Sequence, residues 1–432
     1  MGYLRRRAIT ALLTANAIKP PPPGNFGPLG FAFGWPTGEL APQLLALTAL
    51  DTAQAVLRGK ASRTGLLLAG ASAAGLGYLM SQARRSAELA EVQLAASLGP
   101  DYLDHLPSRP VDADLQIPLR DLAKPFTMAK PDVEVIRNIN YREGGSRARL
   151  DIYRPKGVDL ADAPVLVQVH GGGWAIGDKS QQGLMLMNRL AQRGWVCVAL
   201  NYRLAPKNPF PAQIIDVKKA LAWTKENIAS YGGDPSYVVI TGGSAGGHLS
   251  SLAALTPHVK EYQPGFEDAD TRVSACVPFY GIYDMAGLSG TKYDVEMRDR
   301  FLGPIIFKKD PKKDLAPFEL ASPITHVTED APDFFVIHGA HDGLASVEQG
   351  RQFVAKLREF SRGLVTYLEL PGTQHGFEVF SSVRSQHVIR AVERWLEWHR
   401  ANRRSATELD AGLPDGRSAT LSGTAVEESA AG

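Results

Sequence analysis

A serine enclosed by glycines is the first candidate for chemistry in this chain. Ser244 lies in the segment GGSAGG at 242–247, which follows the apolar run YVVIT at 237–241 and precedes a helix-forming stretch. Glycines two positions before and after the serine permit the sharp strand-to-helix turn of a nucleophile elbow, where larger side chains would collide with backbone. The amino end of the following helix adds partial positive charge at the same point. The pattern predicts that Ser244 is a nucleophile for acyl transfer.

A glycine-rich segment provides N–H groups that such a reaction needs. His170 and the three glycines at 171–173 follow the strand-like run VLVQV at 165–169. Bare glycine backbone can approach a substrate carbonyl and direct N–H groups at its oxygen. The residue after an elbow serine adds another N–H group, whereas His170 is expected to position the loop. The predicted oxyanion-hole residues are Gly171, Gly172, Gly173 and Ala245.

A serine hydroxyl needs a base, and the base needs a third group that holds it in one tautomer. In a fold with a nucleophile elbow, the acid follows a late strand and the histidine follows the last strand. Asp342 follows the apolar run that begins at Phe334, and His375 follows the strand-like residues 366–370 and a short turn. We therefore expect a triad of Ser244, Asp342 and His375.

Competing residues for the acid and the base have other expected roles. His338 and His341 lie on or beside the strand before Asp342, and His387 starts a helix, so none follows the last strand. Glu348 is the rival acid, but the same loop carries it into the next helix, which it is expected to cap or solvate.

The elements that must position these residues become regular from about residue 145 onward. Apolar β-rich runs alternate with helical periods, such as Val388, Val392 and Trp395 near the end. This alternation predicts a doubly wound α/β core, with a mostly parallel sheet covered by helices on both faces. The predicted strands are 164–169, 195–200, 237–241, 273–279, 333–338 and 365–370.

Composition shifts divide the chain into four predicted parts. A helical N-terminal region spans 1–85, a connecting segment 86–134, and an α/β-hydrolase catalytic domain 135–400. Within that domain, the charged and turn-rich residues at about 284–325 read as a cap insertion over the carboxyl edge of the sheet. Residues 401–432 contain no aromatic residue, so we expect a disordered tail.

Two apolar stretches near the N-terminus raise the question of a membrane. Twenty uncharged residues at 64–83 could cross a hydrocarbon core as a helix, and small residues recur every fourth position along them from Gly65. Residues 41–57 are the expected partner, although they carry Asp51. The pair is either a hairpin in a bilayer or a soluble lid. We expect membrane association through residues 41–83, with a cytoplasmic location as the alternative.

Bulk composition excludes other classes of protein. With 47 basic and 45 acidic residues, the chain lacks the field that would attract nucleic acid. Its 44% apolar residues are enough for a large core. Cys197 and Cys276 lie in strand-like runs, so we expect buried thiols and no disulfide. The chemistry described above needs no metal or organic cofactor.

Three motifs together resemble one enzyme family. HGGGW at 170–174, NYRLAP at 201–206 and GGSAGG at 242–247 resemble the hormone-sensitive-lipase family of carboxylesterases and lipases, including the Lip-type esterases of actinobacteria. The resemblance covers about 135–400 and implies hydrolysis of small-molecule or lipid esters through an acyl-serine. This sequence departs from the family where Gly243 and Asn201 replace frequent aspartates.

Three alternatives to an esterase remain open. An amidase or arylformamidase would use the same apparatus. A receptor or scaffold could keep the fold without catalysis, although such proteins commonly lose the base. The chain could also act mainly as a membrane-interaction module through residues 41–83.

Overall fold

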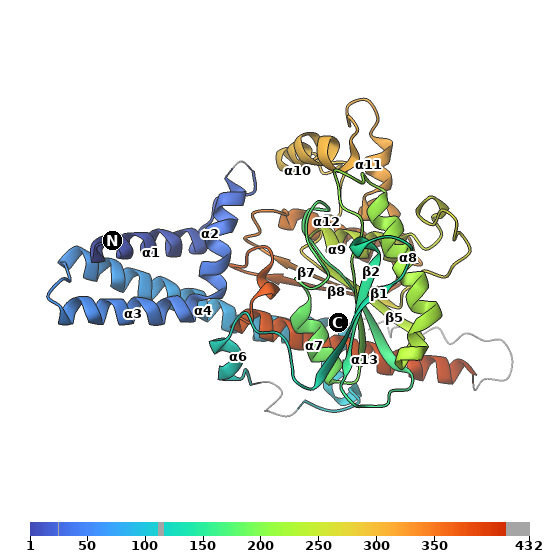
Figure 1. Cartoon of the computed structure of the whole chain (residues 1–432), viewed down its shortest axis with the longest axis horizontal. Helices are drawn as coiled ribbons and strands as arrows, with labels where there is room; N and C mark the ends of the chain where they lie inside the picture. Colours follow the sequence, from blue (N-terminus) through green and yellow to red (C-terminus); the bar gives the residue numbers. More distant parts are fainter. Residues whose placement is uncertain (25, 111–115, 412–432) are drawn as a thin grey trace, which may run out of the picture.

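An eight-stranded sheet forms the centre of the molecule (Figure 1), in the order β1-β2-β4-β3-β5-β6-β7-β8. The computed structural model describes residues 1–24, 26–110 and 116–411, with side chains described as far as Arg403. Strands β3 to β8 are parallel, and β2 runs antiparallel to both of its neighbours. The α/β-hydrolase fold class is therefore confirmed. The strands are β1 Val133–Asn140, β2 Arg149–Pro155, β3 Ala163–Val169, β4 Val196–Leu200, β5 Gly233–Gly243, β6 Ala275–Phe279, β7 Asp333–Gly339 and β8 Val365–Leu370.

The six predicted strands are present, and the edge strand β1 and its neighbour β2 were missed. Strand β1 is mostly half-exposed, and Asn138 in it has a φ of 61° where the register to β2 shifts. Such an irregular, solvated edge has neither a continuous apolar run nor a clean alternation. Strand β2 was missed although it is largely buried, because Arg149, Asp151 and Arg154 interrupt its apolar residues.

Helices cover both faces of the sheet. One face carries α8 (Ala212–Asn227), α9 (Ala245–Leu255) and α12 (Val347–Phe360), whose apolar side chains share a core with alternate strand residues such as Val167. The other face carries α7 (Leu184–Gln192), α13 (Val383–Ala411) and the end of α4 (Arg63–Leu98), which pack with Leu166. Successive residues in a strand point to opposite faces of the sheet. Because helices cover the residues on each face, both faces are buried, as expected for a parallel sheet.

Four helices form the N-terminal region: α1 (Tyr3–Ile18), α2 (Gly27–Glu39), α3 (Ala41–Leu57) and α4. They project to one side of the domain, in blue in Figure 1. The apolar stretch at 64–83 is only the first part of α4, and the boundary expected at 85 falls inside this helix. Ala90, Leu94 and Leu98 of α4 lie in the core beneath the sheet. The charged residues after Ala83 thus continue the helix, because an apolar face persists among them.

Two helices pack against the small residues of α4. Ala69 and Ala73 border α3, as expected for the partner at 41–57. On another side, a β-carbon on Gly65 would lie 2.5 Å from the Tyr3 ring, and one on Gly75 would lie 2.5 Å from Thr14. Helix α1 therefore approaches α4 closely, a contact that the sequence did not predict.

The insertion between β6 and β7 consists of short helical segments. It contains α10 (Lys292–Met297), the π-helical segment η5 (Arg298–Phe307), α11 (Ala316–Leu320) and η6 (Pro323–His326). The remaining short segments are η1 Tyr102–His105, α6 Leu119–Ala123, η2 Ser146–Ala148, η3 Ile228–Tyr231, η4 Lys260–Tyr262 and η7 Phe377–Val379.

Two smaller expectations have different outcomes. Cys197 and Cys276 are buried free thiols, as predicted. The expectation of a disordered tail is wrong for residues 401–411, because α13 continues to Ala411. Adding residues to an existing helix costs far less than nucleating one, and α13 is already fixed by its packed residues. Residues 412–432 of the predicted tail lie outside the described residues.

Candidate active site

Ser244 occupies a sharp turn between β5 and α9. Its backbone has φ 60° and ψ −123°, a conformation that costs energy for any residue other than glycine. A β-carbon on Gly242 would lie 2.5 Å from the Gly246 oxygen, and one on Gly246 would lie 2.1 Å from the Val169 oxygen. The glycines on either side are therefore required sterically, as the motif predicted. The side chain at the apex stays partly exposed.

Asp342 and His375 form a buried pair. His375 Nδ1 lies 2.7 Å from Asp342 Oδ2, while Asp342 Oδ1 accepts the N–H groups of Leu344 and Ala345, each at 2.8 Å. Burial by itself raises the pKa of Asp342. The charge of His375 and hydrogen bonds from His338 and His375 outweigh it and hold that pKa well below its usual value. The carboxylate is therefore ionised at neutral pH and can fix the orientation of the imidazole.

The loops that carry these two residues are bonded to each other. The N–H of Ala340 donates to the oxygen of Leu370 at 2.9 Å, and that of His341 donates to Thr373 at 3.0 Å. Farther along, the N–H of Gly343 donates to Gln374 Oε1 at 3.2 Å. These bonds continue the β7–β8 pairing beyond the strand ends, which brings the acid and the histidine together.

Tyr280 borders both the serine turn and the histidine. Its ring centroid lies 4.5 Å from that of His375, and its hydroxyl lies 2.6 Å from where a β-carbon on Gly243 would stand. The glycine that replaces the family's frequent aspartate is thus explained by the tyrosine that fills its space. The backbone N–H of Ser244 also donates to the oxygen of Phe279, the neighbour of Tyr280, at 3.0 Å.

The glycine loop after β3 lies against the serine. A β-carbon on Gly171 would be 3.2 Å from that of Ser244, and Gly172 and Gly173 have φ values of 112° and 56°. The N–H of Gly171 donates to Gln182 Oε1 at 2.7 Å. In contrast, the N–H groups of Gly172, Gly173 and Ala245 bond to no group within the described residues. Three donors therefore remain for a ligand, and Gly171 shapes the loop.

His170 and the NYRLAP segment support this loop from below. His170 Nδ1 lies 2.7 Å from the oxygen of Gly171, and its ring stacks on Tyr202 with centroids 4.2 Å apart. The Tyr202 hydroxyl donates to the His170 oxygen at 2.9 Å. Burial lowers the pKa of His170 to about 4. A buried, stacked and neutral histidine fits the predicted positioning role.

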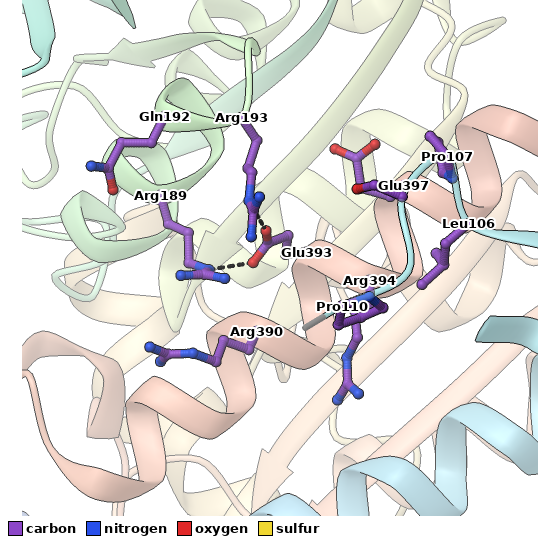
Figure 2. A pocket seen from close by; sticks show the side chains of 11 residues that line it. Leu106, Pro107, Pro110, Arg189, Gln192, Arg193, Arg390, Glu393, Arg394 and Glu397 are labelled. Carbon is purple, nitrogen blue, oxygen red and sulfur yellow. Dashed lines mark hydrogen bonds and ion pairs between the residues drawn. The ribbon is translucent and has the colours of Figure 1, made fainter. Parts of the chain in front are cut away.

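A separate cleft of about 420 Å³ lies between α7 and α13 and contains no member of the predicted triad. Figure 2 shows Arg189 of α7 and Arg193, the residue after α7, reaching the carboxylate of Glu393 on α13. Two further arginines and Glu397 also line the cleft. Its charged groups therefore cross-link two helices on the sheet face.

Comparison with known proteins identifies the family. The family described as BD-FAE matches residues 150–357. The probable carboxylic ester hydrolase LipM of Mycobacterium tuberculosis is 42% identical over 409 residues, which cover 92% of this chain and 93% of LipM. The chain belongs to the Lip-type carboxylic ester hydrolases. Esterase LipQ of the same organism is 40% identical over 73% of this Lip-type hydrolase and 75% of LipQ.

Solved structures agree with this assignment. A truncated carbohydrate esterase from gut microbiota superposes with a TM-score of 0.55 at 25% identity, covering 63% of this chain and 99% of that one. The Lip-type hydrolase is therefore a carboxylic ester hydrolase with an α/β-hydrolase fold.

Sequence reasoning missed several neighbours of the site in this Lip-type hydrolase. His338 was placed correctly on a strand, but its Nε2 also lies 3.5 Å from Asp342 Oδ2. His338 and Asp342 are four residues apart on either side of a strand end, and this spacing was the signal in the sequence that could have indicated their contact. Tyr280 follows β6 directly, so its place beside β5 and β7 could be inferred only once the strand order was known.

His248 is another missed residue, and it braces the glycine loop. Trp174 Nε1 donates to His248 Nδ1 at 3.0 Å, and His248 Nε2 lies 2.8 Å from the oxygen of Ala321 in the insertion. Because that carbonyl can only accept, Nε2 carries the proton. Burial is the main cause that lowers the pKa of His248 to about 4. The neutral ring thus links the loop, α9 and the insertion.

This brace predicts a pH-dependent stability. The pKa of His248 in the folded protein lies below its unfolded value of about 6.5. The contribution of the neutral ring to the free energy of unfolding is therefore complete above pH 6.5 and is lost as the pH falls toward 4. Between pH 7.5 and 4.5, the free energy of unfolding should decrease by about 2.5 kcal/mol more than in His248→Gln, which cannot titrate. Urea titrations of both proteins check this, and parallel pH curves would contradict it.

Proposed function

We propose that this hydrolase cleaves carboxylic esters by acyl transfer to Ser244, with His375 as general base and Asp342 as the group that orients it. The observation that carries the proposal is the 2.7 Å contact between His375 and the ionised Asp342, beside a serine turn that only glycines permit. Nucleophilic serines require this kind of oriented imidazole.

In the first half-reaction, Ser244 Oγ attacks the ester carbonyl carbon and His375 Nε2 accepts the hydroxyl proton. Asp342 stabilises the imidazolium, and the N–H groups of Gly172, Gly173 and Ala245 face the oxyanion. The C–O bond to the alcohol then breaks, and His375 returns the proton to the leaving oxygen. In the second half-reaction, His375 deprotonates a water molecule, which releases the acid and restores Ser244.

Apolar side chains favour an apolar substituent near the oxyanion loop. A β-carbon on Gly173 would lie 3.5 Å from the Phe301 ring of η5, and Ile176 beyond the loop is strongly exposed. Alkyl or aryl ester groups would bury surface against these residues. The insertion that was predicted to shape substrate access therefore supports an apolar ester over a polar one.

The proposed reaction can be tested with a series of nitrophenyl esters of increasing acyl length and a matched aryl formamide. We expect the best ester to exceed the formamide by at least about tenfold in kcat/KM, since nothing among the described contacts is dedicated to an amide nitrogen. A preference for the formamide would instead favour the amidase alternative. Failure of a fluorophosphonate to label Ser244 would favour a silent hydrolase-fold receptor.

We further propose that the projecting N-terminal helices contact a lipid surface. More than half of the exposed large hydrophobic side chains of the described residues lie within 1–78, and Leu57 at the tip is 88% exposed. Arg58, Lys60 and Arg63 are exposed at the same turn. Within the described residues, α4 is long and apolar enough to cross a membrane. Buried core helices of soluble proteins also meet this criterion of length and composition. Basic residues beside apolar ones suit an anionic bilayer.

Vesicle flotation tests this second proposal. With vesicles of phosphatidylcholine and phosphatidylglycerol, replacing Leu47, Leu50 and Leu57 with glutamine should lower the bound fraction at least about tenfold, because each leucine contributes apolar burial. Leu119→Gln is the matched control, since Leu119 is 83% exposed outside the helices. Equal flotation of the wild type, the triple variant and the control would contradict contact through α3.

A further inference from the structure

We propose that Trp35 of helix α2 is a positioning residue for His375, which makes the N-terminal helical region a functional part of the active site. The proposal rests on the role of His375 as the base, stated above. It concerns a side chain that lies 340 positions before the histidine in the sequence and that no motif of the family includes.

Trp35 bonds directly to the backbone that follows His375. Its indole Nε1 donates to the oxygen of Gly376 at 2.8 Å. Gly376 has a φ of 67°, a conformation that glycine adopts without a steric penalty, so the turn after the histidine is intrinsically free to move. A part-buried hydrogen bond on its carbonyl restricts that freedom.

Phe31 extends the same contact to the imidazole itself. It stacks on Trp35 with centroids 5.1 Å apart, and its ring meets the His375 ring edge-on at 6.0 Å and 82°. Trp35 also contacts Phe380 at 4.7 Å, beyond the histidine loop. Phe31 therefore packs against the imidazole that bonds to Asp342, and the two side chains of that pair are only 8% and 0% exposed. Excluding water strengthens an electrostatic contact of this kind.

The start of α2 touches the acid loop as well. A β-carbon on Gly27 would lie 2.4 Å from the oxygen of Gly343, the residue after Asp342. At the residue before Trp35, a β-carbon on Gly34 would lie 3.5 Å from Gln374 Nε2. Helix α2 therefore lies across both loops that the proposed mechanism uses, and small residues allow this approach.

A buried ion pair fixes the end of α2 to the catalytic domain. Glu39 bonds to Arg384 at the start of α13, and the Ser382 hydroxyl donates to Glu39 at 2.6 Å. The Glu39 and Arg384 side chains are 2% and 1% exposed. Breaking a buried pair leaves an uncompensated charge, so the helix is held firmly in register. Trp35, one turn earlier, is thereby fixed relative to the histidine.

The test compares Trp35→Phe, which keeps an aromatic ring but removes the donor, with Phe33→Leu, a control at a 55%-exposed position of the same helix. We expect Trp35→Phe to lower kcat about tenfold with KM changed less than about twofold. The downfield proton resonance of the Asp342–His375 hydrogen bond should broaden, and the melting temperature should stay near that of the control. The control should match the wild type in all four measurements.

Wild-type kcat and an unchanged proton resonance in Trp35→Phe would overturn the proposal. If Trp35→Phe does not fold, Phe31→Leu decides: slower fluorophosphonate labelling of Ser244 with normal melting supports positioning, and an unchanged labelling rate overturns it. Ser244→Ala run in parallel separates the two proposals. Activity remaining in that variant would count against the proposed function, whereas its loss with a normal Trp35→Phe would count only against the positioning role.

Discussion

Replacing Ser244 with alanine is expected to lower kcat/KM for a nitrophenyl ester by at least about a thousandfold. Alanine removes the only atom that could form the acyl-enzyme at this turn, while the backbone and the N–H groups of Gly172 and Gly173 stay in place. Substrate binding should therefore persist, and KM should change much less than kcat. Steady-state kinetics on the acyl series measures both quantities.

The control for this variant is Ser180→Ala, because Ser180 is an exposed serine whose hydroxyl bonds only to Asp178 among the described residues. Its kinetics should match those of the wild type. Loss of fluorophosphonate labelling in Ser244→Ala but not in Ser180→Ala would assign the nucleophile. Activity that survives in Ser244→Ala would require another nucleophile and would remove the basis of the proposed mechanism.

Local patterns explain how much of the fold and site could be predicted. The elbow motif at Ser244 occupies only five residues, and its need for glycine appears in the structure as close approaches at Gly242 and Gly246. Asp342 follows β7 and His375 follows β8. These strands are consecutive in the chain and adjacent in the sheet, so the proximity of the two residues could be expected from their order in the chain. The alternation of apolar runs with helical periods likewise predicted six strands of the sheet correctly.

Long-range contacts explain what could not be predicted. The bond from Trp35 to Gly376 joins positions 341 residues apart, and Glu39 pairs with Arg384 across a similar separation. Neither partner has an unusual local pattern, so nothing near either residue reveals the contact. Helix α4 shows a related limit: its charged second half resembled a connecting segment, although Leu94 lies in the core beneath the sheet.

Asp342→Asn is expected to lower kcat by roughly 10³- to 10⁴-fold, the range set by loss of the correct histidine tautomer in serine hydrolases. Asp342 Oδ1 accepts two backbone N–H groups, from Leu344 and Ala345. In the variant, the amide oxygen must take that place, because an amide NH₂ cannot accept those bonds. The NH₂ group then faces His375 Nδ1 and requires that atom to accept. The proton moves to Nε2, where the base can no longer take the serine proton.

The surroundings of Asp342 make this change of the His375 tautomer hard to avoid. His338 Nε2 lies 3.1 Å from the oxygen of Ala345, a group that can only accept, so this nitrogen carries a proton. It faces Asp342 Oδ2 at 3.5 Å and would meet the amide NH₂ as a second donor. Turning the amide around would instead place NH₂ against two backbone donors, so both orientations lose hydrogen bonds. Glu348→Gln is the matched control, because Glu348 is the rival acid, lies in the first turn of α12 after this loop, and has a side chain that is 43% exposed. A collapse of kcat in Glu348→Gln, with Asp342→Asn within about tenfold of wild type, would reassign the acid.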